Sequence, residues 1–128
     1  YWDYKIGKLT KINSFKIPHT ALILKKDIVK KLNFYNTSYN ISSDTDFILR
    51  MSKLKNLNFK KIKKNFIIME VGGLSNSLKN LQIKIQQDLK IYLDHFNIFF
   101  LLVYFYKIIF KILKLLQWKI FKLLNSKF

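Results

Sequence analysis

The sequence predicts an α/β fold for the first part of the chain. Three segments have the composition or the alternation of strands: residues 4–12, 19–24 and 58–70. Two segments between them, residues 26–32 and 44–55, carry apolar side chains at helical spacing. Strands that alternate with helices along the chain are typical of the α/β class. The last third of the chain differs, because its pattern is helical throughout.

The clearest strand is predicted for residues 19–24, a short apolar run between Pro18 and a pair of lysines. The segment 58–70 carries aliphatic and aromatic side chains together with two lysine pairs, which would mark an exposed edge of a sheet. Residues 4–12 alternate more loosely and fit either a strand or an ordered loop.

Composition and charge limit the class of protein. The chain has 128 residues, half of them hydrophobic and 16% aromatic, so it is not a disordered tail. It has no cysteine, which excludes disulfides and thiolate metal sites. The formal net charge of +17 would ordinarily suggest a nucleic acid or an anionic membrane as partner. Lys, Asn, Ile and Phe are abundant together, as an AT-rich genome favours, so we consider only where the lysines are arranged. The first residue is Tyr1, and we expect a fragment or a processed chain.

Residues 40–50 hold two of the seven acidic residues and the sole arginine of the chain. With Ser42 or Ser43 as N-cap, a helix over residues 44–55 places Asp44 at its positive end. Asp46 and Arg50 are spaced i, i+4 and can pair. A capped helix with one surface ion pair explains this pattern. The alternative is a catalytic carboxylate held at a helix start, which local sequence favours less and which gains weight only from the residues around it.

Two adjacent glycines, Gly72 and Gly73, predict a turn that follows the third strand, because glycine permits positive φ and close approach of the backbone. A connecting helix is expected over residues 76–95, from apolar side chains at helical spacing.

Residues 96–128 predict a basic amphipathic helix. Five lysines fall within a sector of about 140° on a helical wheel: Lys107, Lys111, Lys114, Lys119 and Lys122. The remaining surface is aliphatic and aromatic, which is typical of a helix that lies in the membrane interface. A helix packed on a partner domain with its lysines outward is the alternative. A single span over residues 96–116 with snorkelling lysines stays open.

Several common chemistries are missing from the sequence. There is no glycine-rich phosphate loop. His19 and His95 have no cysteine partners, so a zinc site is not expected. Asp44 and Asp46 would point about 200° apart on a helix and would not share one metal ion. Lysines near residue 60 lie among phenylalanines, but without arginine nearby we expect no nucleic-acid partner.

The order of three motifs resembles the C-terminal half of family 2 glycosyltransferases, in particular bacterial enzymes that build lipopolysaccharide, capsule or other surface glycans. The motifs are His19-Thr-Ala, then Ser43-Asp44-Thr-Asp46-Phe-Ile-Leu-Arg50, then Gly72-Gly73-Leu-Ser75. Asn33 stands where the family's loop has glycine, and Ser43 where many members have glutamate. The resemblance covers roughly residues 17–75. It implies that residues 1–75 are the C-terminal, acceptor-side portion of a GT-A-like (Rossmann-like) domain, followed by the helices already predicted.

The resemblance also implies roles for individual residues. Asp44 would be the catalytic base. Its helix would be supported by three neighbours: Ser43, Asp46 and Arg50. Substrate-binding candidates are His19, Gly72, Gly73 and Ser75.

The resemblance implies a reaction in which an inverting enzyme transfers a sugar from a nucleotide-sugar donor to a glycan acceptor, expected to be lipid-linked. Mg²⁺ or Mn²⁺ would assist in the intact enzyme, with ligands mostly outside this chain. The nucleotide-binding half is expected ahead of Tyr1, so little turnover is expected from these residues alone. The expected location is the cytoplasmic face of the cell membrane, with an anionic membrane surface contacted through residues 96–128. The alternative function is a non-enzymatic basic module that binds the membrane surface.

Overall fold

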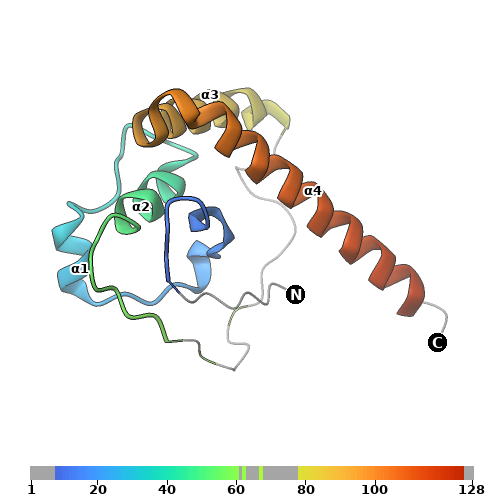
Figure 1. Ribbon diagram of the computed structural model, residues 1–128, viewed down its shortest axis with the longest axis horizontal. Coiled ribbons are helices and arrows are strands. Elements are labelled where there is room, and N and C mark those ends of the chain that lie inside the picture. The colour runs from blue at the N-terminus through green and yellow to red at the C-terminus, as the bar shows by residue number, and fades with distance from the viewer. Residues whose placement is uncertain (1–7, 61, 63–66, 68–77, 126–128) are drawn as a thin grey trace. The chain divides into compact units, whose positions relative to one another are not determined.

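The computed structural model describes residues 8–60, 62, 67 and 78–125 (Figure 1). All regular elements among these residues are helical: η1 (Ser14–Lys16), η2 (His19–Ala21), α1 (Lys26–Lys31), α2 (Ser43–Met51), α3 (Leu78–Phe96), η4 (Asn97–Phe99) and α4 (Phe100–Asn125). They belong to two compact units, residues 1–91 and 92–128, whose boundary lies within α3.

The predicted α/β fold is wrong for the described part of the chain, and with it the GT-A-like, Rossmann-like portion, because no strand is present there. The segment 19–24 shows why. It begins with η2, and Leu22 then has an extended backbone, with φ −94° and ψ 115°. Leu22 and Leu24 pack against the core while Ile23 is exposed, so the alternation of a strand is real. A strand also needs a neighbour to complete its hydrogen bonds, and the described residues supply none.

The other two predicted strands are also corrected where they can be followed. Residues 8–12 form bends and turns, and Asn13 closes the turn through a hydrogen bond from its side chain to the carbonyl of Lys8. Residues 58–60, 62 and 67 are not in a strand. The rest of segments 4–12 and 58–70 lies outside the described residues.

The core of the first unit forms around α2. Phe47, Ile48 and Met51 are spaced along one side of this helix and are almost fully buried. Three apolar residues from the preceding segments complete the buried cluster: Leu9, Ile17 and Leu32. The predicted helices over 26–32 and 44–55 are present, although α1 ends at Lys31 and α2 begins at Ser43 and ends at Met51.

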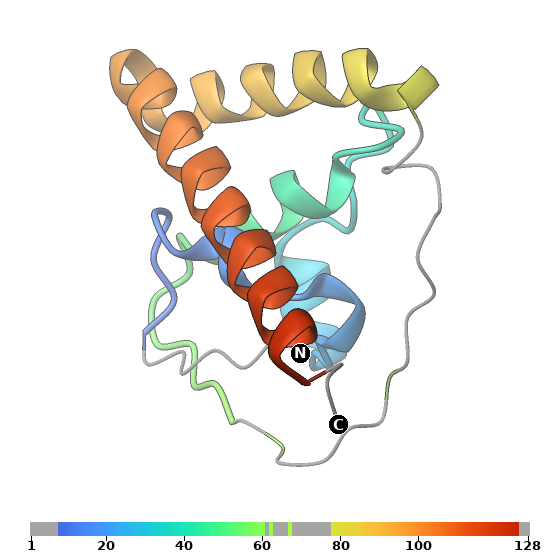
Figure 2. The same ribbon diagram turned by 90° about the vertical axis from the view of Figure 1, so that its right-hand side faces the viewer.

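The second unit contains the last turn of α3, η4 and α4 (Figure 2). Asn97 has a φ of 50° and separates the two helices, a conformation that asparagine tolerates better than most residues. Tyr92 packs edge-on against Tyr104 and stacks with Phe96, with ring centroids 5.5 Å apart in both pairs. In the described part of the chain, no helix has both the length and the apolar content that a membrane span requires.

Candidate functional site

The start of α2 presents a partly exposed carboxylate. Ser42 is the N-cap residue but makes no hydrogen bond of its own to cap the helix. Asp44 instead satisfies one backbone group in the first turn of the helix, because its Oδ1 accepts a hydrogen bond of 2.8 Å from the backbone N–H of Thr45. The positive end of the helix dipole favours a negative charge at this position. Oδ2 of Asp44 remains for a second interaction.

That interaction is with His19. Its Nδ1 lies 3.0 Å from Oδ2 of Asp44, and the two side chains are 48% and 31% exposed. His19 belongs to η2, which follows Pro18, so the first and second motifs of the resemblance meet in space. The structure therefore brings together the predicted base and one of the predicted substrate-binding residues at a solvent-accessible position.

The pair is electrostatically coupled. The hydrogen bond with Asp44 raises the pKa of His19 above its ordinary value of 6.5, and the negative charge of Asp44 acts in the same direction. Partial burial and the nearby charge of Lys84 oppose this rise. The imidazolium form is thus favoured beside the carboxylate, which makes the contact an ion pair over a wider pH range.

Arg50 joins the last turn of α2 to the backbone turn at residues 32–34. Its Nε donates to Oδ2 of Asp46 at 2.8 Å, so the predicted i, i+4 pair is confirmed. Its two Nη atoms donate to the carbonyl oxygens of Leu32 and Phe34. One planar fork thereby joins a buried carboxylate to two backbone carbonyls, which the point charge of a lysine does not match.

The turn held by Arg50 has an unusual backbone. Asn33 and Phe34 both have positive φ, 53° and 57°. Asparagine is among the residues that tolerate this region. For Phe34 the same conformation is strained. The two carbonyl contacts of Arg50 lie on both sides of Asn33 and stabilise the turn.

The sequence did not reveal a contribution from α3. Oε1 of Gln87 accepts hydrogen bonds of 3.1 Å from the backbone N–H groups of both Ile41 and Ser42. These bonds fix the two residues that lead into α2 and hence the direction in which Asp44 points. Lys84, one turn earlier on α3, acts on His19 through its charge. No local pattern signals these contacts, because they join segments far apart in the sequence.

The remaining predicted residues have different outcomes. Ser43 is the first residue of α2 and is half-buried. Gly72, Gly73 and Ser75 lie outside the described residues. In the part of the chain that the structure describes, no three His, Cys, Asp or Glu side chains gather to hold a metal ion. The resemblance implies that the ligands of the expected Mg²⁺ or Mn²⁺ lie mostly outside this chain.

The arrangement suits proton transfer. One carboxylate is placed at a helix start, its side chain is 31% exposed, and two hydrogen bonds orient it.

Comparisons with family models, with curated proteins and with solved structures each returned no match for this chain. The likeness to family 2 glycosyltransferases therefore consists of the order and spacing of its three motifs, and what it implies for activity is treated as a proposal.

Proposed function

We propose that this chain carries the catalytic base of an inverting glycosyltransferase. The enzyme would transfer a sugar from a nucleotide-sugar donor to a glycan acceptor, expected to be lipid-linked, in cell-surface polysaccharide synthesis. The observation that supports this most is the 3.0 Å contact of His19 with Asp44 at the start of α2. It unites two motifs that the resemblance assigns to one active centre.

The reaction is a single displacement. A carboxylate oxygen of Asp44 takes the proton of the acceptor hydroxyl while the hydroxyl oxygen attacks the anomeric carbon of the donor. The new C–O bond forms as the bond between the anomeric carbon and the nucleotide oxygen breaks, and the nucleotide leaves with the electron pair. Attack from the face opposite the leaving group inverts the anomeric centre. Asp44 then releases its proton to solvent. A divalent metal, where bound, would supply positive charge to the leaving diphosphate.

The neighbours of Asp44 act as positioning residues. His19 selects one orientation of the carboxylate through Oδ2. Asp46 and Arg50 fix α2 against the turn at Asn33, and Gln87 fixes the entry into the helix. Such support matters because a misplacement of about 1 Å can reduce the rate of an oriented reaction by about a hundredfold.

The test compares two acidic residues in the complete gene product. Asp44→Asn keeps the shape of the side chain but removes its basicity. Asp27→Asn is the matched control, since Asp27 is an exposed acid in the first turn of α1. Nucleoside diphosphate release is measured with UDP-glucose, UDP-galactose, UDP-N-acetylglucosamine and GDP-mannose in the presence of a bacterial lipid extract.

We expect Asp44→Asn to reduce release by about a hundredfold or more, with unchanged circular dichroism, while Asp27→Asn stays within about twofold of the native protein. Release that survives Asp44→Asn would contradict the proposal, as would the absence of release with every donor.

A non-enzymatic module that binds membranes is the second candidate, and the exposed apolar surface of α4 favours it. In that case Asp44 only stabilises the start of α2. Asp44→Asn would then leave every function of the protein intact, whereas changes in α4 would abolish it.

A further inference from the structure

The lysine stripe of α4 begins on the inside of the second unit. Lys107, its first member, is only 4% exposed. Its Nζ lies 4.8 Å from the ring centre of Tyr92 and 5.5 Å from that of Tyr104. A cation over two aromatic rings is well accommodated, and this contact fixes the rotation of α4 about its own axis. The stripe continues through Lys111, which is half-buried, to Lys114 and Lys119, which are exposed.

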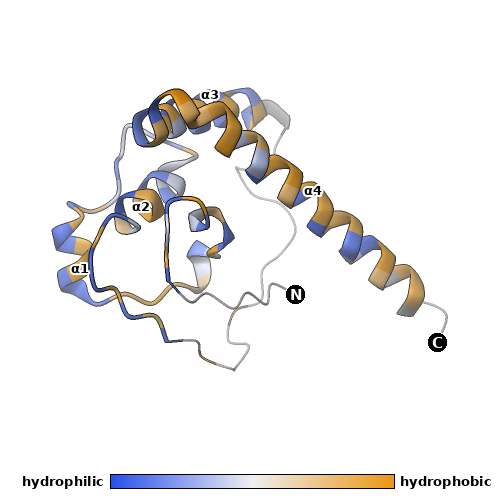
Figure 3. Cartoon of the chain, in the orientation of Figure 1, coloured by the Kyte–Doolittle hydropathy of each residue, from blue (hydrophilic) through white to orange (hydrophobic). Residues whose placement is uncertain are grey.

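The opposite side of α4 is apolar and exposed. Leu102, Ile109 and Leu116 follow one another at intervals of seven residues, and they lie about 150° from the middle of the lysine stripe. Their exposed fractions are 70%, 56% and 50%. Figure 3 shows that hydrophobic colour covers most of α4 and is interrupted by short hydrophilic bands. A helix of a water-soluble domain would bury this apolar face.

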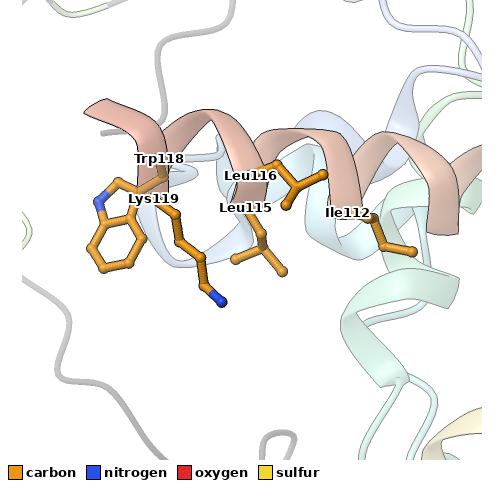
Figure 4. Close-up of a pocket in the computed structure, with 5 residues that line it drawn as sticks. All are labelled: Ile112, Leu115, Leu116, Trp118 and Lys119. Carbon is orange, nitrogen blue, oxygen red and sulfur yellow. The ribbon is translucent and has the colours of Figure 1, made fainter. Parts of the chain in front are cut away.

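The last turns of α4 add an interfacial pattern. Trp118 and Lys119 line one shallow hollow on this helix together with Ile112, Leu115 and Leu116 (Figure 4). An indole beside a lysine is typical of the level at which lipid headgroups meet acyl chains. Long lysine side chains can reach from an apolar surface to the phosphates.

We infer that α4 lies along an anionic lipid bilayer, with the face of Leu102, Ile109 and Leu116 among the acyl chains and Lys114 and Lys119 at the phosphates. Charge complementarity selects this occupant. A second copy of the chain would carry the same net charge of +17 and repel the first, whereas an anionic bilayer neutralises the lysines. This inference is independent of the chemistry proposed for Asp44.

The experiment uses the 128-residue chain with Trp2→Phe, which leaves Trp118 as the one fluorophore of its type. Binding is measured by cosedimentation with vesicles of phosphatidylcholine alone, and with vesicles in which about a third of the lipid is phosphatidylglycerol. We expect binding at least about tenfold tighter to the anionic vesicles, together with a blue shift of Trp118 emission.

Two sets of substitutions distinguish the contribution of the apolar face of α4 to vesicle binding from the contribution of exposed apolar side chains elsewhere. Binding to anionic vesicles should weaken at least about tenfold in a protein that combines three substitutions in α4: Leu102→Gln, Ile109→Gln and Leu116→Gln. The matched control combines Ile12→Gln, Ile23→Gln and Ile83→Gln, three isoleucines elsewhere in the chain whose exposed fractions are 55%, 74% and 44%. The control should bind as the unsubstituted chain does. Circular dichroism checks that both proteins remain helical.

Three results would overturn the inference. One is a chain that fails to bind anionic vesicles. Another is binding that the α4 substitutions leave unchanged. The third is a discrete dimer in light scattering that those substitutions dissociate while vesicle binding persists, since the apolar face would then be an interface between copies.

Discussion

At the scale of single residues, the contact of His19 with Asp44 couples the charge of an imidazole to that of a carboxylate. A carboxylate beside an imidazole accepts a stronger hydrogen bond when the imidazole is protonated. Protonation of His19 and the integrity of the contact are therefore linked. Lys84 weakens this linkage, because its charge disfavours the imidazolium form.

The linkage predicts a pH dependence with a definite sign. The pKa of His19 is raised in the folded protein, so the stabilisation from this contact is fully present below the unfolded value of 6.5 and is lost as pH rises through the folded pKa. Asp44→Asn should lower the pKa of His19. It should also destabilise the protein more at about pH 6 than at about pH 8.5.

Imidazole titration by NMR measures the first effect, and urea unfolding at the two pH values measures the second. His19→Gln assigns the resonance, because His95 is the other histidine. A His19 pKa that is the same in the native protein and in Asp44→Asn would refute the linkage.

At the scale of elements, the predicted helices are present, whereas the predicted strands are wrong for the described residues. The segments that became α1, α2, α3 and α4 were recognisable because a helix satisfies its backbone hydrogen bonds locally, so its pattern is contained in a short window. The segment 19–24 has the alternation of a strand, but a sheet depends on a partner elsewhere in the chain. Local sequence predicted the ion pair of Asp46 with Arg50 for the same reason. The contacts of Gln87 with Ile41 and Ser42 have no local signature.

The link from α2 to the turn before it predicts that a charge-conserving substitution of Arg50 destabilises the first unit. Arg50→Lys keeps the positive charge near Asp46 but removes the fork that contacts Leu32 and Phe34. We expect a loss of about 1–3 kcal/mol in the free energy of unfolding, because carbonyl groups at a strained turn lose their donors.

Chemical denaturation followed by circular dichroism measures this loss. Lys53→Arg, the reverse exchange at an exposed residue just after α2, is the matched control and should change stability by less than about 0.5 kcal/mol. Equal stabilities of Arg50→Lys and the native chain would show that the fork contributes nothing.

At the scale of the whole molecule, two kinds of attraction to polyanions must be distinguished. The net charge of +17 attracts any polyanion, whereas the apolar face of α4 binds only a surface in which apolar side chains can be buried. Salt screens the first, with a Debye length of about 8 Å at physiological ionic strength, and leaves the second almost unchanged.

Raising the salt from about 0.02 M to about 0.15 M should therefore remove most binding to duplex DNA, by about a hundredfold or more, while binding to anionic vesicles persists with a smaller loss. Electrophoretic mobility shifts and vesicle cosedimentation on one preparation provide the comparison. DNA binding that survives at physiological salt would instead favour a nucleic-acid partner.

The turn at Asn33 and Phe34 has a consequence for the order in which the protein assembles. Two consecutive residues with positive φ are rare in an unfolded chain, and the carbonyls beside them find their donors only after α2 has formed and presented Arg50. The turn should therefore form after α2 during folding. For the same reason, we expect fraying of α2 and opening of this turn to be coupled.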